Sequence, residues 1–459
     1  MVNRCLRLRS LCARLLCARA PVSAALLAGA AALMATPLQA AEDTQAEIER
    51  LKQELAAVTE RLARLEEQLA RSPQVDAQTP QPEAAPAEEP LSVEVLSAAA
   101  PGAEREEAVA VEDEPDIHIG GAVRFNAFFR DFERSSESKR GESGFDLFRL
   151  GIDGEYRNLL ISAEYRWYPF MDTLHHGWVG YEFDGGDQVQ VGVHKVPFGI
   201  LPFASHNYWF GVPYYLGLAD DYDLGVKYTR DDGPWNTQAA FYKSEELGDP
   251  TSVNRYGFDL VRQGEQQNEE INRFNLRLAR TFGAGSGCEH EVGLSGQRGQ
   301  LYNADTDDSG TTWAAAAHLD SRCGRWNVQL QAARYDYAPK NTAGVDDSIV
   351  RMGAFAAGYD VVSDADVLVA NLAYNFNVPW RAIDQITCYN DYSRLFKDTA
   401  GFEDSQLNTT GCAIGVGSLF TYLDVIQASN MPFFEDGSLA GGGDDEWHTR
   451  VNLNIGYYW

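Results

Sequence analysis

Positively charged side chains recur in this sequence at positions that alternate with large apolar ones. Arg124 lies between Val123 and Phe125, and Arg166 lies between Tyr165 and Trp167. On an extended chain, neighbouring residues point to opposite faces, so bases in this pattern share one face and apolar side chains the other. The bases that fit the pattern are Arg124, Arg130, Arg149, Arg166, Lys227, Arg277 and Arg450. Bases gathered on one surface can attract anions.

The same rule places several acids on the face that carries the bases, namely Asp153, Glu155, Glu164 and Glu291. Arg166 and Glu164 are next neighbours on that face. Two interpretations therefore stay open. The bases either line an anion-attracting surface or form ion pairs that only satisfy one another.

Catalytic and metal-binding patterns have little support. His175 and His176 are adjacent, so on a regular strand they would face opposite sides, and no serine or carboxylate is marked by spacing as their partner. The cysteines lack CxxC pairs, which argues against a zinc site. We therefore predict no enzyme, no metal and no cofactor.

The composition restricts the class of protein. The 459 residues carry a formal net charge of -29, which argues against nucleic acid as a partner. The chain has 22 Phe, 21 Tyr and 41 Gly, a content that favours an all-β fold. Because the bases fall within the alternating segments, we expect the excess acid in the N-terminal region and in exposed loops, for example at Asp220, Asp221 and Asp223.

Residues 1–40 have the features of a secretory signal peptide. A basic segment precedes the apolar run 22–34, and Leu38-Gln39-Ala40 resembles a cleavage site. A membrane anchor is the alternative, but the apolar run is short for a spanning helix. No later segment offers eighteen uninterrupted apolar residues, so any membrane crossing by the rest of the chain would use strands.

Residues 41–71 predict a coiled-coil oligomerisation helix. Apolar residues recur at alternating steps of three and four, at Ile48, Leu51, Leu55, Val58, Leu62, Leu65 and Leu69. The charges at the flanking positions favour a parallel, in-register homo-oligomer, and a lone amphipathic helix is the alternative. Residues 72–115 are rich in proline, alanine and acids, which predicts an extended tether that could reach the cell wall.

From residue 116 to residue 459 the chain alternates almost continuously, with frequent turn signals. The predicted strands are 116–133, 144–157, 159–169, 173–183, 189–198, 222–231, 236–247, 272–282, 289–302, 311–321, 327–338, 364–377, 382–395, 407–417, 419–430 and 447–459. Residues 350–362 could add another, but bacterial single-chain barrels have even strand numbers, so we assign them to a long loop. The prediction is a sixteen-stranded antiparallel transmembrane β-barrel whose last strand closes against its first.

Four cysteines follow the leader. The loops of two predicted hairpins bring Cys288 within a few residues of Cys323, and Cys388 within a few residues of Cys412. Two cross-strand disulfides are therefore plausible in an oxidising compartment, with free thiols as the alternative.

Three short stretches resemble the phosphate-selective porin O and P family: VQVGVHKVPFG at 189–199, YNDYS at 389–393 and the terminal NIGYYW. The resemblance covers residues 116–459. It implies a sixteen-stranded trimeric porin in contact with outer-membrane lipid. It also implies that Lys195 lies where a strand enters a loop that folds into the channel.

The loop that follows Lys195 is rich in aromatic residues: Phe203, Tyr208, Trp209, Phe210, Tyr214 and Tyr215. Folded inward, these rings would narrow the channel and offer flat apolar faces to sugars or other organic solutes. Packing against the wall or a neighbouring subunit is the alternative for most of them.

Two functions follow from these features. The first is an outer-membrane porin for small hydrophilic solutes, anionic or neutral, with a lumen that favours anions such as phosphate or organic anions. The second is a structural barrel with a largely closed pore, which would tether the envelope or act as an adhesin.

Overall fold

The computed structural model describes residues 115–459 except 245–246, 249–254, 381, 436 and 442–445. The predicted signal peptide and coiled coil, and the predicted tether apart from Pro115, lie outside the described residues.

Most of the described chain forms β-strands, which is what continuous alternation of apolar and polar residues predicts. The strands are β1 (Asp116–Arg130), β2 (Glu142–Tyr156), β3 (Leu159–Trp167), β4 (Asp172–Glu182), β5 (Gln188–Lys195), β6 (Tyr222–Asp232), β7 (Trp235–Ser244), β8 (Asp259–Leu260), β9 (Asn268–Phe282), β10 (Cys288–Asn303), β11 (Asp308–Cys323), β12 (Trp326–Ala338), β13 (Ile349–Ala354), β14 (Ala357–Val362), β15 (Asp364–Phe376), β16 (Gln385–Lys397), β17 (Ser405–Val416), β18 (Leu419–Ser429) and β19 (His448–Tyr458). The short helix α3 (Arg134–Lys139) and the 3-10 helix η1 (Val212–Leu216) lie in loops.

Sixteen of these strands form one closed antiparallel barrel, which confirms the predicted strand number and fold class. Strands that are neighbours in the barrel follow chain order. The strands β8, β13 and β14 are not barrel strands and form a separate sheet. The barrel closes where β19 pairs with β1, from Ala122 opposite Tyr458 to Arg130 opposite Arg450. A closed barrel leaves no sheet edge with unpaired backbone groups, as a bilayer requires.

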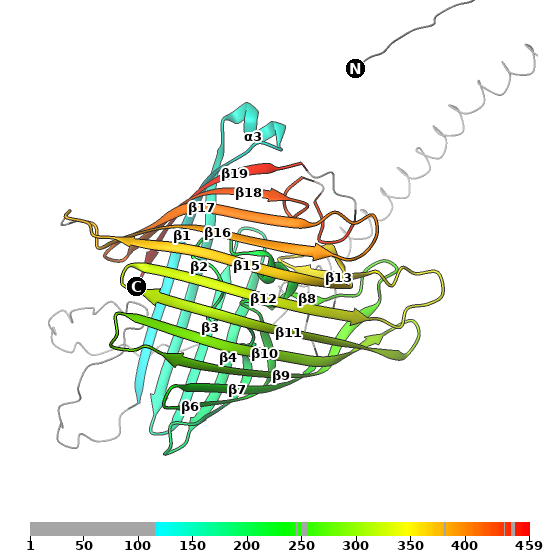
Figure 1. Ribbon diagram of the computed structural model, residues 1–459, viewed down its shortest axis with the longest axis horizontal. Helices are drawn as coiled ribbons and strands as arrows, with labels where there is room; N and C mark the ends of the chain where they lie inside the picture. Colours follow the sequence, from blue (N-terminus) through cyan, green and yellow to red (C-terminus); the bar gives the residue numbers. More distant parts are fainter. Residues whose placement is uncertain (1–114, 245–246, 249–254, 381, 436, 442–445) are drawn as a thin grey trace, which may run out of the picture. The chain divides into compact units, whose positions relative to one another are not determined.

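The two ends of the barrel differ, and Figure 1 shows the long connections gathered at one of them. Connections such as 157–158, 233–234 and 324–325 are short, and we name their side the turn end. Four long connections lie on the opposite side, the loop end: 196–221, 245–267, 339–363 and 430–447. Short turns on one side and long loops on the other are typical of outer-membrane barrels.

Side chains alternate between the outer surface and the interior, as β9 illustrates. Leu276 and Leu278 are exposed on the outside, whereas the alternating residues Asn275 and Arg277 are buried inside. Near the turn end the outer surface carries exposed aromatic residues, among them Trp235, Phe282, Trp326, Phe376 and Tyr457. An apolar outer band with an aromatic girdle suits a lipid environment. Within the described residues, no helix is long and apolar enough to cross a membrane.

Residues 350–362 do not cross with the barrel strands, as expected, but they are not an irregular loop. They fall in the hairpin of β13 and β14, and β13 also pairs with β8, to form a separate three-stranded sheet. The prediction that this segment belongs to a long loop is confirmed, and the loop contains a hairpin that was not predicted. The alternation that made this segment resemble a strand is real, because its apolar side chains fill a core inside the barrel instead of facing lipid.

Two β-bulges each change the direction of one side chain in the barrel wall. Leu147 pairs with Arg124 and Phe145 with Phe125, so Asp146 is the extra residue of β2. In the same way, His175 is the extra residue of β4 where Glu164 pairs with His176. A β-bulge breaks the strict alternation of faces.

Candidate pore and constriction

The connection 196–221 between β5 and β6, here named the constriction loop, runs along the inner wall of the barrel. The Gly199 amide donates to Ser295 Oγ of β10 at 3.0 Å, and the Ile200 amide to Gln331 Oε1 of β12 at 3.0 Å. Further along, Asn371 Nδ2 of β15 donates to the Ala204 carbonyl at 3.0 Å. Inward polar side chains of β10, β12 and β15 thus hold the backbone of the loop.

The loop continues past β16 to β2. The His206 amide donates to Asp391 Oδ2 of β16 at 2.6 Å, and the Tyr208 hydroxyl donates to Asp146 Oδ1 at 2.8 Å. The first turn depends on Gly199, whose φ is +63° and where a Cβ would approach Gln331 Oε1 to 2.3 Å. Only glycine fits this conformation and this close approach.

Five predicted pore-lining bases keep part of their side chain exposed inside the barrel. The exposed side-chain fractions are 28% for Arg149, 22% for Arg130, 20% for Lys195, 19% for Arg124 and 13% for Arg166. They come from β1, β2, β3 and β5, four strands that lie close together around the barrel.

Each of these bases also contacts an acid. Arg124 lies 2.9 Å from Asp146, and Arg130 lies 2.7 Å from Glu142. Lys195 forms an ion pair with Asp220 and donates to the Pro202 carbonyl at 3.0 Å.

One carboxylate forms ion pairs with two of the bases. Glu164 lies 2.9 Å from Arg149 and 2.5 Å from Arg166. Arg149, Arg166 and Glu164 together therefore carry two positive charges and one negative charge.

Three other predicted bases do not face open space. Arg277 is 2% exposed; its Nε donates to the Gly199 carbonyl at 2.8 Å, and its Nη2 lies 2.5 Å from Glu291. Lys227 donates to the Lys195 carbonyl at 3.0 Å and is buried.

The third buried base is Arg450, which lies between two aromatic rings. Its guanidinium is 4.5 Å from the Phe128 ring centre and 4.4 Å from that of Trp209. Arg277 and Arg450 hold the constriction loop, Lys227 holds the strand end from which it leaves, and all three point inward without lining an open channel.

The predicted constriction aromatics divide into two groups. Tyr214 and Tyr215 are buried. Phe203, Tyr208, Trp209 and Phe210 are half-buried. Packing inside the protein therefore accounts for the first group, and the second group retains surface inside the barrel.

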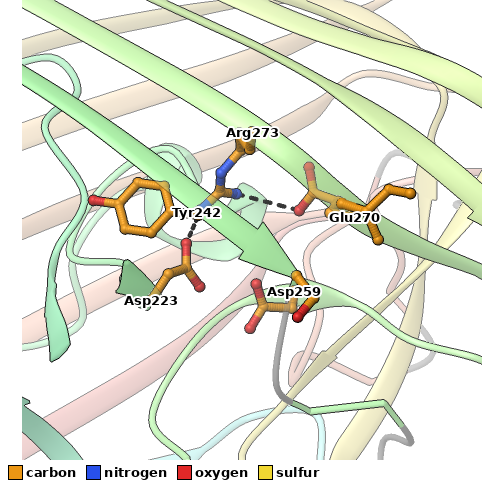
Figure 2. Close-up of a pocket in the computed structure, with 7 residues that line it drawn as sticks. Asp223, Tyr242, Asp259, Glu270 and Arg273 are labelled. Carbon is orange, nitrogen blue, oxygen red and sulfur yellow. Dashed lines mark hydrogen bonds and ion pairs between the residues drawn. The ribbon is translucent and has the colours of Figure 1, made fainter. Parts of the chain in front are cut away.

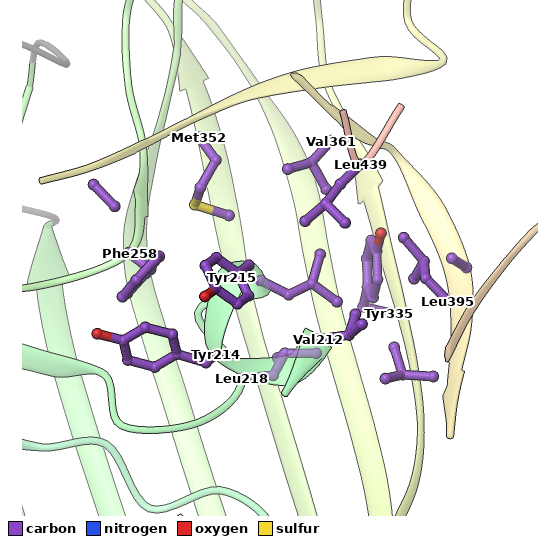
Figure 3. Close-up of a cluster of buried hydrophobic side chains, with 14 of the residues drawn as sticks. Val212, Tyr214, Tyr215, Leu218, Phe258, Tyr335, Met352, Val361, Leu395 and Leu439 are labelled. Atoms are coloured by element: carbon purple, nitrogen blue, oxygen red, sulfur yellow. The ribbon is translucent and has the colours of Figure 1, made fainter. Parts of the chain in front are cut away.

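The buried tyrosines belong to a hydrophobic core inside the loop end, here named the loop core. It combines η1, β8, β13, β14 and the side chains of Met431, Phe434 and Leu439 with inward side chains of the wall. Figure 3 shows part of this cluster, including Tyr215, Met352 and Leu439. Its fully buried side chains include Val212, Leu260, Val350, Met352, Val361 and Leu439. Burial of one such side chain stabilises by about 1.5–3 kcal/mol, so the cluster makes a large contribution to the stability of the loop end.

Backbone and polar contacts join the parts of the loop core. The Val362 amide donates to the Leu439 carbonyl at 2.9 Å, and the Val261 amide to the Arg351 carbonyl at 2.9 Å. The Tyr359 hydroxyl donates to the Tyr215 carbonyl at 2.8 Å. Four loops far apart in sequence thus form one folded unit.

The two adjacent histidines of β4 contact each other, contrary to the expectation of opposite faces. The bulge brings His175 Nδ1 within 2.8 Å of His176 Nδ1, and Ser162 Oγ lies 2.9 Å from His176 Nε2. The His175 ring packs against Tyr222 and Tyr256, with ring centres 4.2 and 4.5 Å apart. This pair therefore links the wall to the loops that it supports.

Three acids that were expected in exposed loops are instead buried inside the protein. Figure 2 shows Arg273 between Asp223 and Glu270, with which it forms ion pairs, beside Asp259. Asp220, Asp221 and Asp223 are all at least nine-tenths buried. The prediction of exposed acids is wrong at these positions, because a buried arginine and tyrosine hydroxyls supply internal partners.

Two groups of side chains within the described residues come close enough to be considered as metal ligands. Asp221, Asp223 and Asp259 bring carboxylate oxygens within 4.8 Å of one another, but the Arg273 guanidinium already pairs with the first two. Cys288 and Cys323 lie near His290, but they form a disulfide with each other. Neither group is arranged as a metal centre.

Both cysteine pairs expected from the hairpin registers are joined. Cys288 lies opposite Cys323 and Cys388 opposite Cys412, and each pair forms a disulfide. These bonds link adjacent barrel strands and lie away from the constriction loop.

Several side chains that hold the constriction loop were not predicted from the sequence. Tyr389, Asp391 and Ser393 alternate on one face of β16 and point inward, a period-2 signal within the YNDYS stretch. Asp146 has no such signal, because its position depends on a bulge.

No protein-family model and no curated protein matches the sequence. Among solved structures, OmpF of Salmonella typhi, in complex with daunomycin, aligns with a TM-score of 0.53 at 10% identity, over 76% of this chain and 99% of that one. OmpT of Vibrio cholerae, expressed in the outer membrane, aligns with a TM-score of 0.50 at 13% identity, over 77% and 100%. At these identities the likeness shows the fold. The chain has the fold of outer-membrane porins.

Proposed function

We propose that this protein is a porin of the bacterial outer membrane that lets small hydrophilic solutes diffuse passively, with a lumen that favours anions such as phosphate or organic anions. The observation that carries the proposal is the group of partly exposed bases on β1, β2, β3 and β5, where Arg149 and Arg166 share one acid. Clustered bases in a confined, poorly screened space concentrate anions. On this proposal the chain acts as a channel and not as a catalyst.

The assignment to the phosphate-selective porin O and P family belongs to the same proposal and rests on the short sequence stretches. So do contact with outer-membrane lipid, a homotrimeric state, and a periplasmic coiled coil and tether at 41–115 that contacts the cell wall. Lys195 and the half-buried rings of Phe203, Tyr208, Trp209 and Phe210 would border the path of the solute.

The loop core supports a second candidate, a structural barrel with a largely closed pore. Its cluster of fully buried apolar side chains lies within the loop end of the barrel. Such a barrel would carry no current until the loop core is unpacked.

Currents through purified protein in planar bilayers test the channel. We expect steady single-channel steps in KCl, and an Arg149→Gln variant should lower the preference for chloride over potassium because it removes one exposed lumen charge. Arg334→Gln is the matched control, since Arg334 is an outward-facing base paired with Asp364 and Asp366. Absence of current from folded protein would overturn the channel and favour the structural barrel.

A further inference from the structure

Bases inside the barrel are repeatedly placed over aromatic rings. Lys195 Nζ lies 5.5 Å from the Phe203 ring centre and 5.1 Å from that of Tyr222. The Arg124 guanidinium lies 5.3 Å from the Tyr208 ring centre. Positions within about 6 Å of a ring centre are attractive for a cation.

The pattern continues along the same part of the wall. The Arg149 guanidinium is 5.4 Å from the Tyr458 ring centre, and that of Arg166 is 5.0 Å from the ring centre of Tyr256. Four bases on β1, β2, β3 and β5 therefore each lie beside an aromatic ring, and the rings of Tyr222 and Tyr256 are buried.

At the start of the constriction loop, both members of one pair are partly exposed. The side chain of Lys195 is 20% exposed, and Phe203 is half-buried. The Phe203 ring meets that of Phe210 edge to face at 4.9 Å, and Phe210 stacks on Tyr214 at 4.2 Å. This aromatic row is fixed on one side by the loop core, so Phe203 keeps its position beside the base.

We propose, on the basis of the channel function above, that the pair of Lys195 and Phe203 binds solutes that carry a carboxylate on an aromatic ring. The carboxylate would bind the base, and the solute ring would pack edge to face or offset against the protein ring. Phosphate or acetate uses only the first contact, and an uncharged aromatic alcohol uses only the second. A solute with both groups at benzoate spacing uses both at once.

Isothermal titration of the detergent-purified full chain tests the site without the need for an open channel. The ligands are benzoate, cyclohexanecarboxylate, acetate and benzyl alcohol. Benzoate should bind about three- to tenfold more tightly than cyclohexanecarboxylate, which has the same charge and similar bulk but no aromatic ring. Equal affinity for these two ligands would overturn the proposal.

Variants locate the site. Phe203→Leu should remove the advantage of benzoate over cyclohexanecarboxylate, and Lys195→Gln should weaken the binding of both carboxylates. Phe396→Leu is the matched control, because Arg394 lies 4.7 Å from the Phe396 ring centre in an exposed pair on a barrel strand. An unchanged benzoate advantage in a folded Phe203→Leu variant would contradict the assignment.

A separate measurement of KCl current distinguishes a failure of the proposed binding site from a failure of the proposed channel. Preferential benzoate binding without current would support this site and overturn the channel. Current without preferential benzoate binding would leave the channel and overturn this site.

Discussion

His206 joins the constriction loop to the barrel wall through both of its ring nitrogens. His206 Nδ1 lies 2.7 Å from Asp391 Oδ1, and Nε2 lies 2.6 Å from Asn327 Oδ1. Two oxygen acceptors are satisfied together only when both nitrogens carry a proton. Burial alone would lower the pKa of His206, but the hydrogen bond and charge of Asp391 outweigh it, so this pKa is raised above its usual value near 6.5.

The stability of the loop should therefore depend on pH. Because the folded-state pKa of His206 is raised, its stabilising contribution is complete below the unfolded value of about 6.5 and is lost as pH rises through the folded value. Denaturant unfolding between pH 6 and pH 9 should show this loss in the wild type.

Replacement of the histidine should remove that part of the pH dependence. His206→Gln should cost about 2 kcal/mol at pH 6, the size of a hydrogen bond to a charged group, and less at pH 9. His118→Gln, at an exposed histidine, is the control. Equal pH dependence in the wild type and in His206→Gln would refute the role of this residue.

Residue types and alternation predicted which bases point inward, but not which of them stay exposed. Arg149 and Arg277 have the same pattern in the sequence, yet one is 28% exposed and the other 2%. The difference arises because the constriction loop lies over Arg277. Sequence periodicity describes the strand that carries a side chain, and it contains no information about the path of a loop from elsewhere in the chain.

At the scale of elements, the seam between β1 and β19 depends on a close backbone approach. The Gly121 amide donates to the Trp459 carbonyl at 3.0 Å, and the Trp459 amide donates back at 3.2 Å. A Cβ on Gly121 would lie 2.5 Å from the Trp459 ring and 2.6 Å from the Arg149 carbonyl.

Gly121→Ala should weaken barrel closure. The added methyl group cannot be accommodated without a shift of backbone or ring, which costs about 1–3 kcal/mol or more. The fraction of protein that keeps its folded mobility on unheated SDS gels measures the effect. Gly144→Ala in the same hairpin is the control, since a Cβ there meets no atom within 4 Å. Equal folded fractions for the two variants would contradict this account of the seam.

The hairpin of β13 and β14 can be disrupted separately from the barrel. Val361 is fully buried in the loop core, so Val361→Asp should unpack the core, because an unpaired buried carboxylate is costly. We expect a larger single-channel conductance with normal folded mobility on gels.

Ala343→Asp, at an exposed position of the same connection, should leave the conductance unchanged. A folded Val361→Asp variant with wild-type conductance would show that the loop core does not limit the pore.

The even strand number and the spacing of the hairpins predicted the strands well. Each strand must alternate apolar and polar side chains, because one face meets lipid and the other the interior. The segment 350–362 was correctly assigned to a loop, but its hairpin was not predicted, since period-2 alternation does not say whether the apolar face meets lipid or another loop. The cysteine pairs were within reach of prediction because an antiparallel register follows from the length of the connecting loop.

At the scale of the whole molecule, an acidic chain encloses a lumen with clustered bases on one side. Three acids that were expected in the outer loops, Asp220, Asp221 and Asp223, are buried. They form ion pairs with Lys195 and Arg273. The net charge of -29 therefore says little about the field inside the barrel. The proposed anion preference rests on the partly exposed bases of β1, β2, β3 and β5.

The reversal potential of the full-length protein in a planar bilayer, under a tenfold KCl gradient, tests the central claim most directly. A channel with this lumen should pass chloride more readily than potassium, so the sign of the potential should correspond to anion preference and its size should fall at high salt as screening increases. A clear cation preference, or no current from folded protein, would contradict the account.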